Sequence, residues 1–241
     1  MTDIINKQSE CRPLAVTNLD TGLLKVIAIS IMLFDHIAVV FFPEQTWMRA
    51  ITRCGYPLFC YCMVIGMLYT HDFKRYLLRV LILALVSQPF TLILRPDWSP
   101  GDPIIWNEVF NLAISLIGVY GVKSGRWWLL PYCILAIVVL DLPYSLLSIL
   151  WMLVFYLCRH RRIAGILSYS AVVALFSITS APGQVASIGP VELNIYVFAL
   201  LAIPFIFIRT NSGLKLPKWF FYAFYPGHMV VLLAIRFLQQ I

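Results

Sequence analysis

Asp35 and His36 stand next to each other inside the apolar stretch LKVIAISIMLFDHIAVVFF, residues 24–42. On insertion scales an ionised aspartate near the centre of a membrane helix costs roughly 2.5–3.5 kcal/mol, so it requires a partner, a proton or water. Adjacent residues of a helix point about 100° apart, so the partners of these two side chains must come from other helices. The pair indicates either proton handling inside a membrane or a simple hydrogen bond between helices.

Tyr225 and His228 bring a similar polar pair into the last apolar stretch, within the segment FYAFYPGHMVV. Three residues apart, they share one helix face, and Pro226 and Gly227 between them loosen the helix. At about 1.5 Å per residue, His228 lies about 12 Å from the start of its stretch, and His36 lies about 16–20 Å from the start of the first. These similar depths predict that His36 and His228 line one cavity near the middle of the membrane.

Arg53, Asn107 and Asn111 complete the candidate polar set. Arg53 begins the second apolar stretch, in RCGYPLF, where it either stabilises a carboxylate or an oxyanion or reaches the lipid headgroups. Asn107 and Asn111 share a face at the start of the fourth stretch, and we expect both to contribute to substrate binding. We expect no metal site, since the six cysteines form no Cys-x-x-Cys pair and are interpreted as small packing residues.

The elements that must position these residues are membrane helices. Of the 241 residues, 61% are hydrophobic and 12% are charged, which is half the charged fraction of roughly 25% found in globular domains. We predict an all-α polytopic bundle, with a short cytosolic segment over residues 1–22 and one membrane domain over residues 23–241. Nine transmembrane helices are expected, over residues 23–42, 54–69, 77–94, 109–122, 127–141, 144–157, 163–178, 193–208 and 220–238.

The division between the fifth and sixth stretches, at residues 141–144, fits either a tight turn or a kink in one long helix. Charge favours the turn, because nine helices place fourteen Lys and Arg residues on one side and only four on the other. Positive residues concentrate on the cytosolic side of membrane proteins, so the N-terminus is expected in the cytosol. The same distribution accounts for the net charge of +7 without a nucleic-acid partner.

The residues by themselves leave two kinds of function open. In acyl transfer, an imidazole accepts the proton of an attacking amine or hydroxyl, a carboxylate supports the imidazole and a cation stabilises the oxyanion. In proton-coupled transport the same groups form a relay, although the odd helix count and the lack of an inverted repeat argue against it. Cytosolic Lys and Arg residues would attract the phosphates of an acyl-CoA, but the chain has no Gly-rich phosphate loop.

Five segments of the chain, taken in order, resemble the TraX family, which includes the TrbP-like conjugation proteins. They are LKVIAISIMLFDHIAVVFF, RCGYPLFCYCMVIGM, SQPF, WNEVFNLAISLIG and FFYAFYPGHMVVLL, and the resemblance covers residues 23–235. It implies a multi-pass enzyme of the bacterial inner membrane that acetylates the N-terminus of a pilin subunit during conjugative pilus assembly. Acetyl-CoA is the implied co-substrate, and no bound cofactor is expected.

Position by position, the resemblance points to the same polar residues. The matched positions are Asp35, His36, Arg53, Pro57, Asn107, Tyr225 and His228. We therefore hypothesise that His36 is the base, that Asp35 supports it, and that Arg53 or His228 stabilises the oxyanion. A midplane cavity would let an extracytoplasmic pilin N-terminus meet a cytosolic acyl donor. The remaining alternative is a non-catalytic assembly factor, in which Asp35 and His36 are replaceable.

Overall fold

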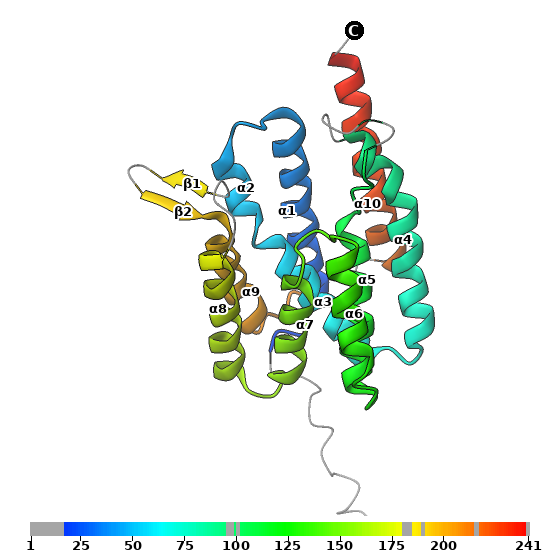
Figure 1. The fold of residues 1–241 in the computed structure, drawn as a ribbon, viewed down its shortest axis with the longest axis vertical. Helices are drawn as coiled ribbons and strands as arrows, with labels where there is room; N and C mark the ends of the chain where they lie inside the picture. The colour runs from blue at the N-terminus through cyan, green and yellow to red at the C-terminus, as the bar shows by residue number, and fades with distance from the viewer. Residues whose placement is uncertain are drawn as a thin grey trace, which may run out of the picture.

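The computed structural model describes residues 17–94, 99, 102–179, 185–188, 191–214 and 217–239 as a bundle of helices (Figure 1). In chain order the elements are α1 (Thr21–Phe41), α2 (Thr46–Thr52), α3 (Gly55–Tyr69), α4 (Phe73–Leu94), α5 (Glu108–Lys123), α6 (Leu129–Val139), α7 (Leu147–Leu157), α8 (Arg162–Thr179), β1 (Val185–Ile188), β2 (Val191–Asn194), η2 (Ile195–Ala202), α9 (Ile203–Phe207) and α10 (Lys218–Gln239). Each of the nine apolar stretches corresponds to a helical segment, the eighth being η2 followed directly by α9.

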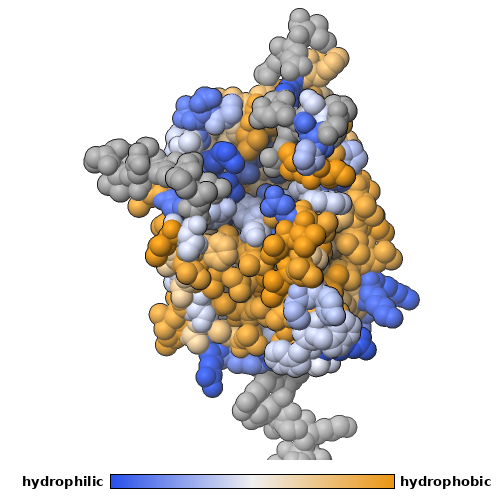
Figure 2. Space-filling model, viewed as in Figure 1, coloured by the Kyte–Doolittle hydropathy of each residue, from blue (hydrophilic) through white to orange (hydrophobic). Residues whose placement is uncertain are grey.

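Five segments in the described part of the chain are long and apolar enough to cross a membrane. They are α1, α2 together with α3, α4, α8 and α10. Helices α6 and α7 have only 11 residues each, so the count of nine crossings stays a prediction. Figure 2 shows apolar residues covering the middle of the visible face, with polar residues gathered toward its two ends. This distribution is typical of a protein embedded in a bilayer.

The connections between helices lie at opposite ends of the bundle (Figure 1). The α1–α2 connection and the β1–β2 hairpin lie at one end, whereas the α3–α4 and α7–α8 connections lie at the other. A chain that crosses a membrane repeatedly requires such an alternation. Which end faces the cytosol is a prediction from the charge distribution.

The hairpin of β1 and β2 is a small addition to the predicted all-helical architecture. Its strands are antiparallel and pair Val185 with Asn194 and Ile188 with Val191. The valine and isoleucine residues of this segment favour extended backbone, because branching at Cβ restricts the side chain in a helix. No strand pairing was predicted for the segment between the seventh and eighth stretches.

A tight turn separates α6 from α7, which confirms the turn and excludes one long kinked helix. Asp141, Tyr144 and Ser145 have positive φ angles of 46°, 59° and 42°, a conformation that costs free energy in residues other than glycine. Asn111 of α5 stabilises the turn, because its Nδ2 donates to the carbonyl oxygens of Pro143 and Ser145. The backbone strain is thus supported from a neighbouring helix.

The core of the bundle forms around α3. In the segment that contains α3, 72% of the apolar window is buried, against 17–28% in the other four candidate spans. Tyr61 of α3, Trp151 of α7 and Tyr169 of α8 are among the largest fully buried side chains. The Tyr61 and Phe155 rings meet edge to face at 5.4 Å, and Phe155 in turn contacts Tyr169 at 5.6 Å. The surrounding helices are thereby fixed around one central element.

The residues just before α1 are hydrogen-bonded to α9 and to the segment that follows it. Asn18 Nδ2 donates to the Phe205 carbonyl at 2.8 Å and to Thr210 Oγ1 at 3.0 Å. Asp20 caps α1 by accepting from the amide of Leu23, and it also accepts from the amide of Ser212 at 2.6 Å. These bonds satisfy donors at the first turn of α1 and fix the depth of Asp35 and His36 in the bundle.

Candidate active site

A cavity of about 380 Å³, termed the Asp35 cavity, lies between α1, α4, α5, α10, η2 and the α6–α7 turn. Its polar and charged lining consists of Asp35, His36, Arg49, Arg53, Thr91, Asn107, Glu108, Tyr144, Tyr196 and Tyr225. Five of the seven residues predicted from the sequence therefore line one cavity. The other two, His228 and Asn111, lie against residues of its wall.

Asp35 is held by a threonine of the neighbouring short helix. Thr52, at the end of α2, donates its hydroxyl proton to Asp35 Oδ1. Thr52 is buried, while Asp35 keeps part of its surface open to the cavity. Helix α2 lies at the end of the bundle where α1 finishes (Figure 1). A carboxylate held by a hydrogen bond in the cavity lining is suited to attract a cationic group.

His36 and His228 meet edge to face, with their ring centroids 4.9 Å apart. In each ring Nδ1 lies 2.9 Å from the carbonyl oxygen four residues earlier, that of Met32 for His36 and that of Phe224 for His228. Because a carbonyl only accepts, Nδ1 carries the proton, and Nε2 is the basic nitrogen of each neutral ring. The buried Nε2 of His228 has no hydrogen-bond partner among the described residues. The predicted proximity of the two histidines is therefore seen in the structure.

Arg53 is held inside the bundle by tyrosines. Its Nη1 donates to the hydroxyl of Tyr144 at 2.7 Å, and its guanidinium lies 5.4 Å and 5.9 Å from the ring centroids of Tyr144 and Tyr196. The Tyr144 ring is stacked on Tyr56 of α3 at 3.8 Å. These contacts keep the cation at the cavity wall, an orientation that differs from the alternative in which Arg53 extends to the headgroups.

The two asparagines are strongly engaged with the protein itself. Asn107 caps α5 through its Oδ1 and donates from Nδ2 to the Ala84 carbonyl at 2.6 Å. Asn111 Oδ1 accepts from the hydroxyls of Ser115 and Ser148, while its Nδ2 supports the α6–α7 turn. Asn107 also lines the Asp35 cavity, whereas Asn111 lies behind it. Substrate binding by these residues stays a prediction, and their visible contacts position the site.

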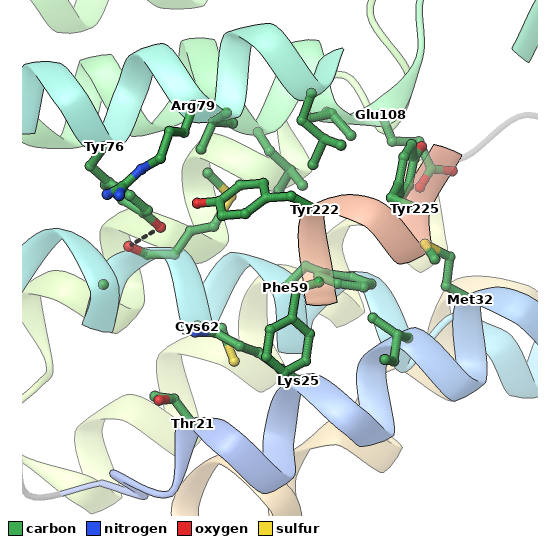
Figure 3. Close-up of a pocket in the computed structure, with 18 of the residues that line it drawn as sticks. Thr21, Lys25, Met32, Phe59, Cys62, Tyr76, Arg79, Glu108, Tyr222 and Tyr225 are labelled. Carbon is green, nitrogen blue, oxygen red and sulfur yellow. Dashed lines mark hydrogen bonds between the residues drawn. The ribbon is translucent and has the colours of Figure 1, made fainter. Parts of the chain in front are cut away.

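A second cavity of about 510 Å³, termed the Lys25 cavity, lies between α1, α3, α4, α5 and α10 (Figure 3). Glu108 and Tyr225 line both this cavity and the Asp35 cavity. In Figure 3 these two side chains lie close together at one end of the Lys25 cavity, at the start of α5 and within α10. They therefore form a shared wall between the two spaces.

Several polar residues of the site, among them Thr52, Glu108, Tyr144 and Tyr196, were not among the predicted ones. These four come from a helix end, a first helical turn, a loop and a 3-10 helix. Only Glu108 gave a usable signal, as the single acidic residue in the first turn of an otherwise apolar helix. A threonine or tyrosine at the edge of an apolar stretch is ordinary in membrane proteins, so no pattern distinguishes the other three.

The arrangement combines the groups that acyl transfer requires. The basic Nε2 atoms can accept a proton from an amine, and the Asp35 carboxylate can attract an ammonium group. The Arg53 guanidinium can stabilise negative charge on a carbonyl oxygen. Asp35 makes no direct hydrogen bond to the ring nitrogen Nδ1 of His36, which is bonded to Met32, so its support of His36 would act through space.

Comparison with known proteins yields one family and one relative. A family model described as "TraX protein" matches residues 20–236 of the chain. A protein described as "Probable fimbrial assembly protein FimC, serogroup H1", from Dichelobacter nodosus, is 26% identical over 236 residues, covering 90% of this chain and 96% of the relative. No solved structure matches the chain.

Proposed function

Because the chain belongs to the TraX family, we propose that it is a membrane-embedded acetyltransferase that modifies the N-terminal amine of a pilin subunit. The proposed donor is acetyl-CoA, and the proposed location is the bacterial inner membrane. A role in pilus assembly is supported by the relative that is described as a fimbrial assembly protein and is matched over nearly its whole length. The apolar surface and the five candidate spans support a membrane location.

The observation that carries the proposal is the composition of the Asp35 cavity. It places the Asp35 carboxylate, the His36 imidazole and a fixed guanidinium around one space of about 380 Å³, with the His228 ring in contact with His36. Structural hydrogen bonds between helices would require neither two basic nitrogens at one place nor a guanidinium held at the wall. The alternative of a single satisfied polar pair therefore explains less of the geometry.

In the proposed reaction the pilin amine enters the Asp35 cavity as an ammonium attracted by Asp35. His36 Nε2 takes a proton from it, and the neutral amine attacks the thioester carbonyl carbon. Arg53 stabilises the negative charge on the carbonyl oxygen. The C–N bond forms and the C–S bond breaks. The attacking nitrogen passes its second proton to the leaving thiolate, so that coenzyme A leaves as the thiol, and His36 then releases the first proton to solvent.

The proposed orientation has the N-terminus in the cytosol and nine helical segments that cross or enter the membrane. The uneven distribution of Lys and Arg supports it, and so do the connections at alternating ends of the bundle. In this orientation the Asp35 cavity belongs to the extracytoplasmic half, where a processed pilin presents its new N-terminus. The shorter helices would require local thinning of the bilayer or cover by neighbouring helices.

The test is mass spectrometry of a pilin subunit co-expressed with the chain. We expect the mass of one acetyl group on the pilin N-terminus with the native chain, and no such modification with His36→Ala. His160→Ala is the matched control, because His160 is an exposed histidine between α7 and α8 and lies outside the cavity lining. Complete acetylation in the presence of His36→Ala, at equal amounts of inserted protein, contradicts the assignment of the base.

The name of the relative also favours a second candidate, a non-catalytic factor for pilus assembly. In that case pili form normally with Asp35→Asn and His36→Ala, provided that the variants insert into the membrane. Deletion of the chain would then abolish pili without changing the mass of any pilin. The two candidates are thus separated by the same mass measurement.

A further inference from the structure

The Lys25 cavity reaches Glu108 and Tyr225, the wall that it shares with the Asp35 cavity, from a second side. Along α1 it extends from Thr21, at the end where the helix begins, to Met32, a separation of about 16 Å at the helical rise. The Asp35 cavity begins one turn further along the same helix, at Asp35. The two cavities therefore approach one place in the bundle from opposite ends.

The charges in the Lys25 cavity are separated along its length. Lys25 of α1 and Arg79 of α4 are the cations of its lining, and Glu108 at the other end is its carboxylate. Lys25 lies 5.5 Å from the ring centroid of Phe221, and Figure 3 shows Arg79 beside Tyr76. Within the described residues neither cation forms a salt bridge. Two unneutralised cations at one end of a cavity are suited to an anionic head group.

Between the charged ends the walls are apolar and aromatic. Phe59, Met63 and Val80 are among the apolar lining residues, and Tyr222 points into the space from α10 (Figure 3). Gly66 of α3 allows the Tyr76 side chain of α4 to pack closely against it, since an added Cβ would lie 2.8 Å from the Tyr76 hydroxyl. The volume of about 510 Å³ lies within the range of roughly 300–1,000 Å³ that is usual for small-molecule sites. An elongated ligand with a charged head and a flexible, largely uncharged chain fits this shape.

We propose that the Lys25 cavity binds the acyl donor as a phosphate-bearing thioester of coenzyme A, with phosphate oxygens at Lys25 and Arg79. The pantetheine chain extends along the aromatic wall, and the acyl carbonyl arrives at Tyr225 and Glu108. There the amine from the Asp35 cavity reaches the carbonyl carbon. This assignment rests on the proposed acetyl transfer, and it adds the donor site and two separate entrances, so that neither substrate has to pass through the cavity of the other.

The test measures donor binding without turnover, so that it is independent of any pilin. The full chain is purified in nanodiscs, and binding of coenzyme A is followed by calorimetry. Lys25→Gln and Arg79→Gln, each alone, are expected to weaken binding roughly tenfold or more, because each removes one charge-assisted hydrogen bond to phosphate. Lys74→Gln is the matched control, since Lys74 is an exposed cation of the same helix α4 outside the cavity, and it should bind coenzyme A as the native chain does.

Two further ligands identify the head group. Pantetheine, which lacks the phosphates, should bind much more weakly than coenzyme A, and its affinity should be the same for the native chain and Arg79→Gln. Equal affinity of coenzyme A for the native chain and both variants overturns the assignment, as does displacement of coenzyme A by phosphatidylglycerol in the nanodisc, which would assign the cations to a lipid head group. Cation-dependent binding of coenzyme A without any acetylated pilin would instead leave this site standing and contradict the proposed acceptor.

Discussion

Replacing Asn111 by alanine is expected to loosen the α6–α7 turn and, through Tyr144, to release Arg53 from the wall of the Asp35 cavity. Asn111 Nδ2 donates to the carbonyls of Pro143 and Ser145, the two residues that flank Tyr144. The Tyr144 hydroxyl in turn accepts from Arg53 at 2.7 Å. A single buried amide thus connects the helix α5 to the cation of the site.

The magnitude follows from the groups that lose a partner. In Asn111→Ala the hydroxyls of Ser115 and Ser148, which lie 2.7 Å apart, can still bond to each other. The carbonyls of Pro143, which is half-buried, and Ser145, which is exposed, lose their donor. An ordinary hydrogen bond contributes about 0.5–1.5 kcal/mol, so we expect a loss of about 1–3 kcal/mol in the free energy of unfolding. For a chain of this size that corresponds to a fall of roughly 2–12 °C in Tm.

The assay is thermal unfolding of the purified chain, followed together with acetylation of a co-expressed pilin. Asn111→Asp should resemble Asn111→Ala, because it keeps the acceptor for the serines but loses both donations to the turn. Ser115→Ala is the control, since Asn111 Oδ1 and Ser148 retain their bond at 2.7 Å, and its cost should stay below about 1 kcal/mol. An unchanged Tm together with lost acetylation in Asn111→Ala would refute this reasoning and favour direct contact of Asn111 with the substrate.

Three other predictions concern the cation, a close contact and a cap. Arg53→Gln is expected to lower the rate of pilin acetylation about 100-fold or more at an equal amount of inserted protein, as measured by mass spectrometry over time, because one oxyanion donor is lost. Gly22→Ala is expected to lower stability by about 1–3 kcal/mol in a denaturation assay, since an added Cβ would overlap the backbone carbonyl oxygen of Leu214. The hydrogen bond from the Ser212 amide lowers the pKa of Asp20 below its ordinary value of 3.8, so this charge stabilises the fold fully above pH 3.8 and loses its effect as the pH falls through the lowered value. The difference in Tm between the native chain and Asp20→Asn should therefore be constant above pH 3.8 and shrink below it, whereas a constant difference down to pH 2 would contradict the role of the charge.

The helical segments and the proximity of the two histidines could be predicted from the sequence, because both follow from the positions of the apolar stretches. Apolar stretches bounded by charged or proline-rich loops have few structural alternatives in a membrane protein. Counting residues from the ends of such stretches gives the depth of each side chain in the membrane. The similar depths of His36 and His228 predicted that they lie together, and their ring centroids are 4.9 Å apart. The position of Arg53 at the start of a stretch left two interpretations open, a cation at the level of Asp35 or a side chain that reaches the headgroups, and the structure places Arg53 in the lining of the Asp35 cavity.

The contacts that hold these groups were beyond prediction. Tyr144 reaches Arg53 because its backbone adopts a positive φ of 59°, a conformation that a tyrosine takes only under tertiary constraint. Thr52 contacts Asp35 because α2 ends there and α3 begins after a two-residue break, which no periodicity indicates. The hydrogen bonds of Asn107 and Asn111 to backbone carbonyls also depend on which helices are neighbours, and apolar stretches alone do not specify neighbours.

The attachment of Asn18 to Phe205 and Thr210 has a consequence for the order in which the chain is assembled. The bonded residues are 187 and 192 positions apart, so a chain emerging from the ribosome inserts its first helix long before the partners of that helix are synthesised. During this interval the start of α1 remains without its final anchor, and Asp35 and His36 without their final depth. The hydrogen bonds of Asn18 can form only after η2 and α9 have been synthesised. A nascent chain that ends before residue 205 would contain Asp35 and His36, yet it would lack the hydrogen bonds of Asn18 that fix their depth in the bundle.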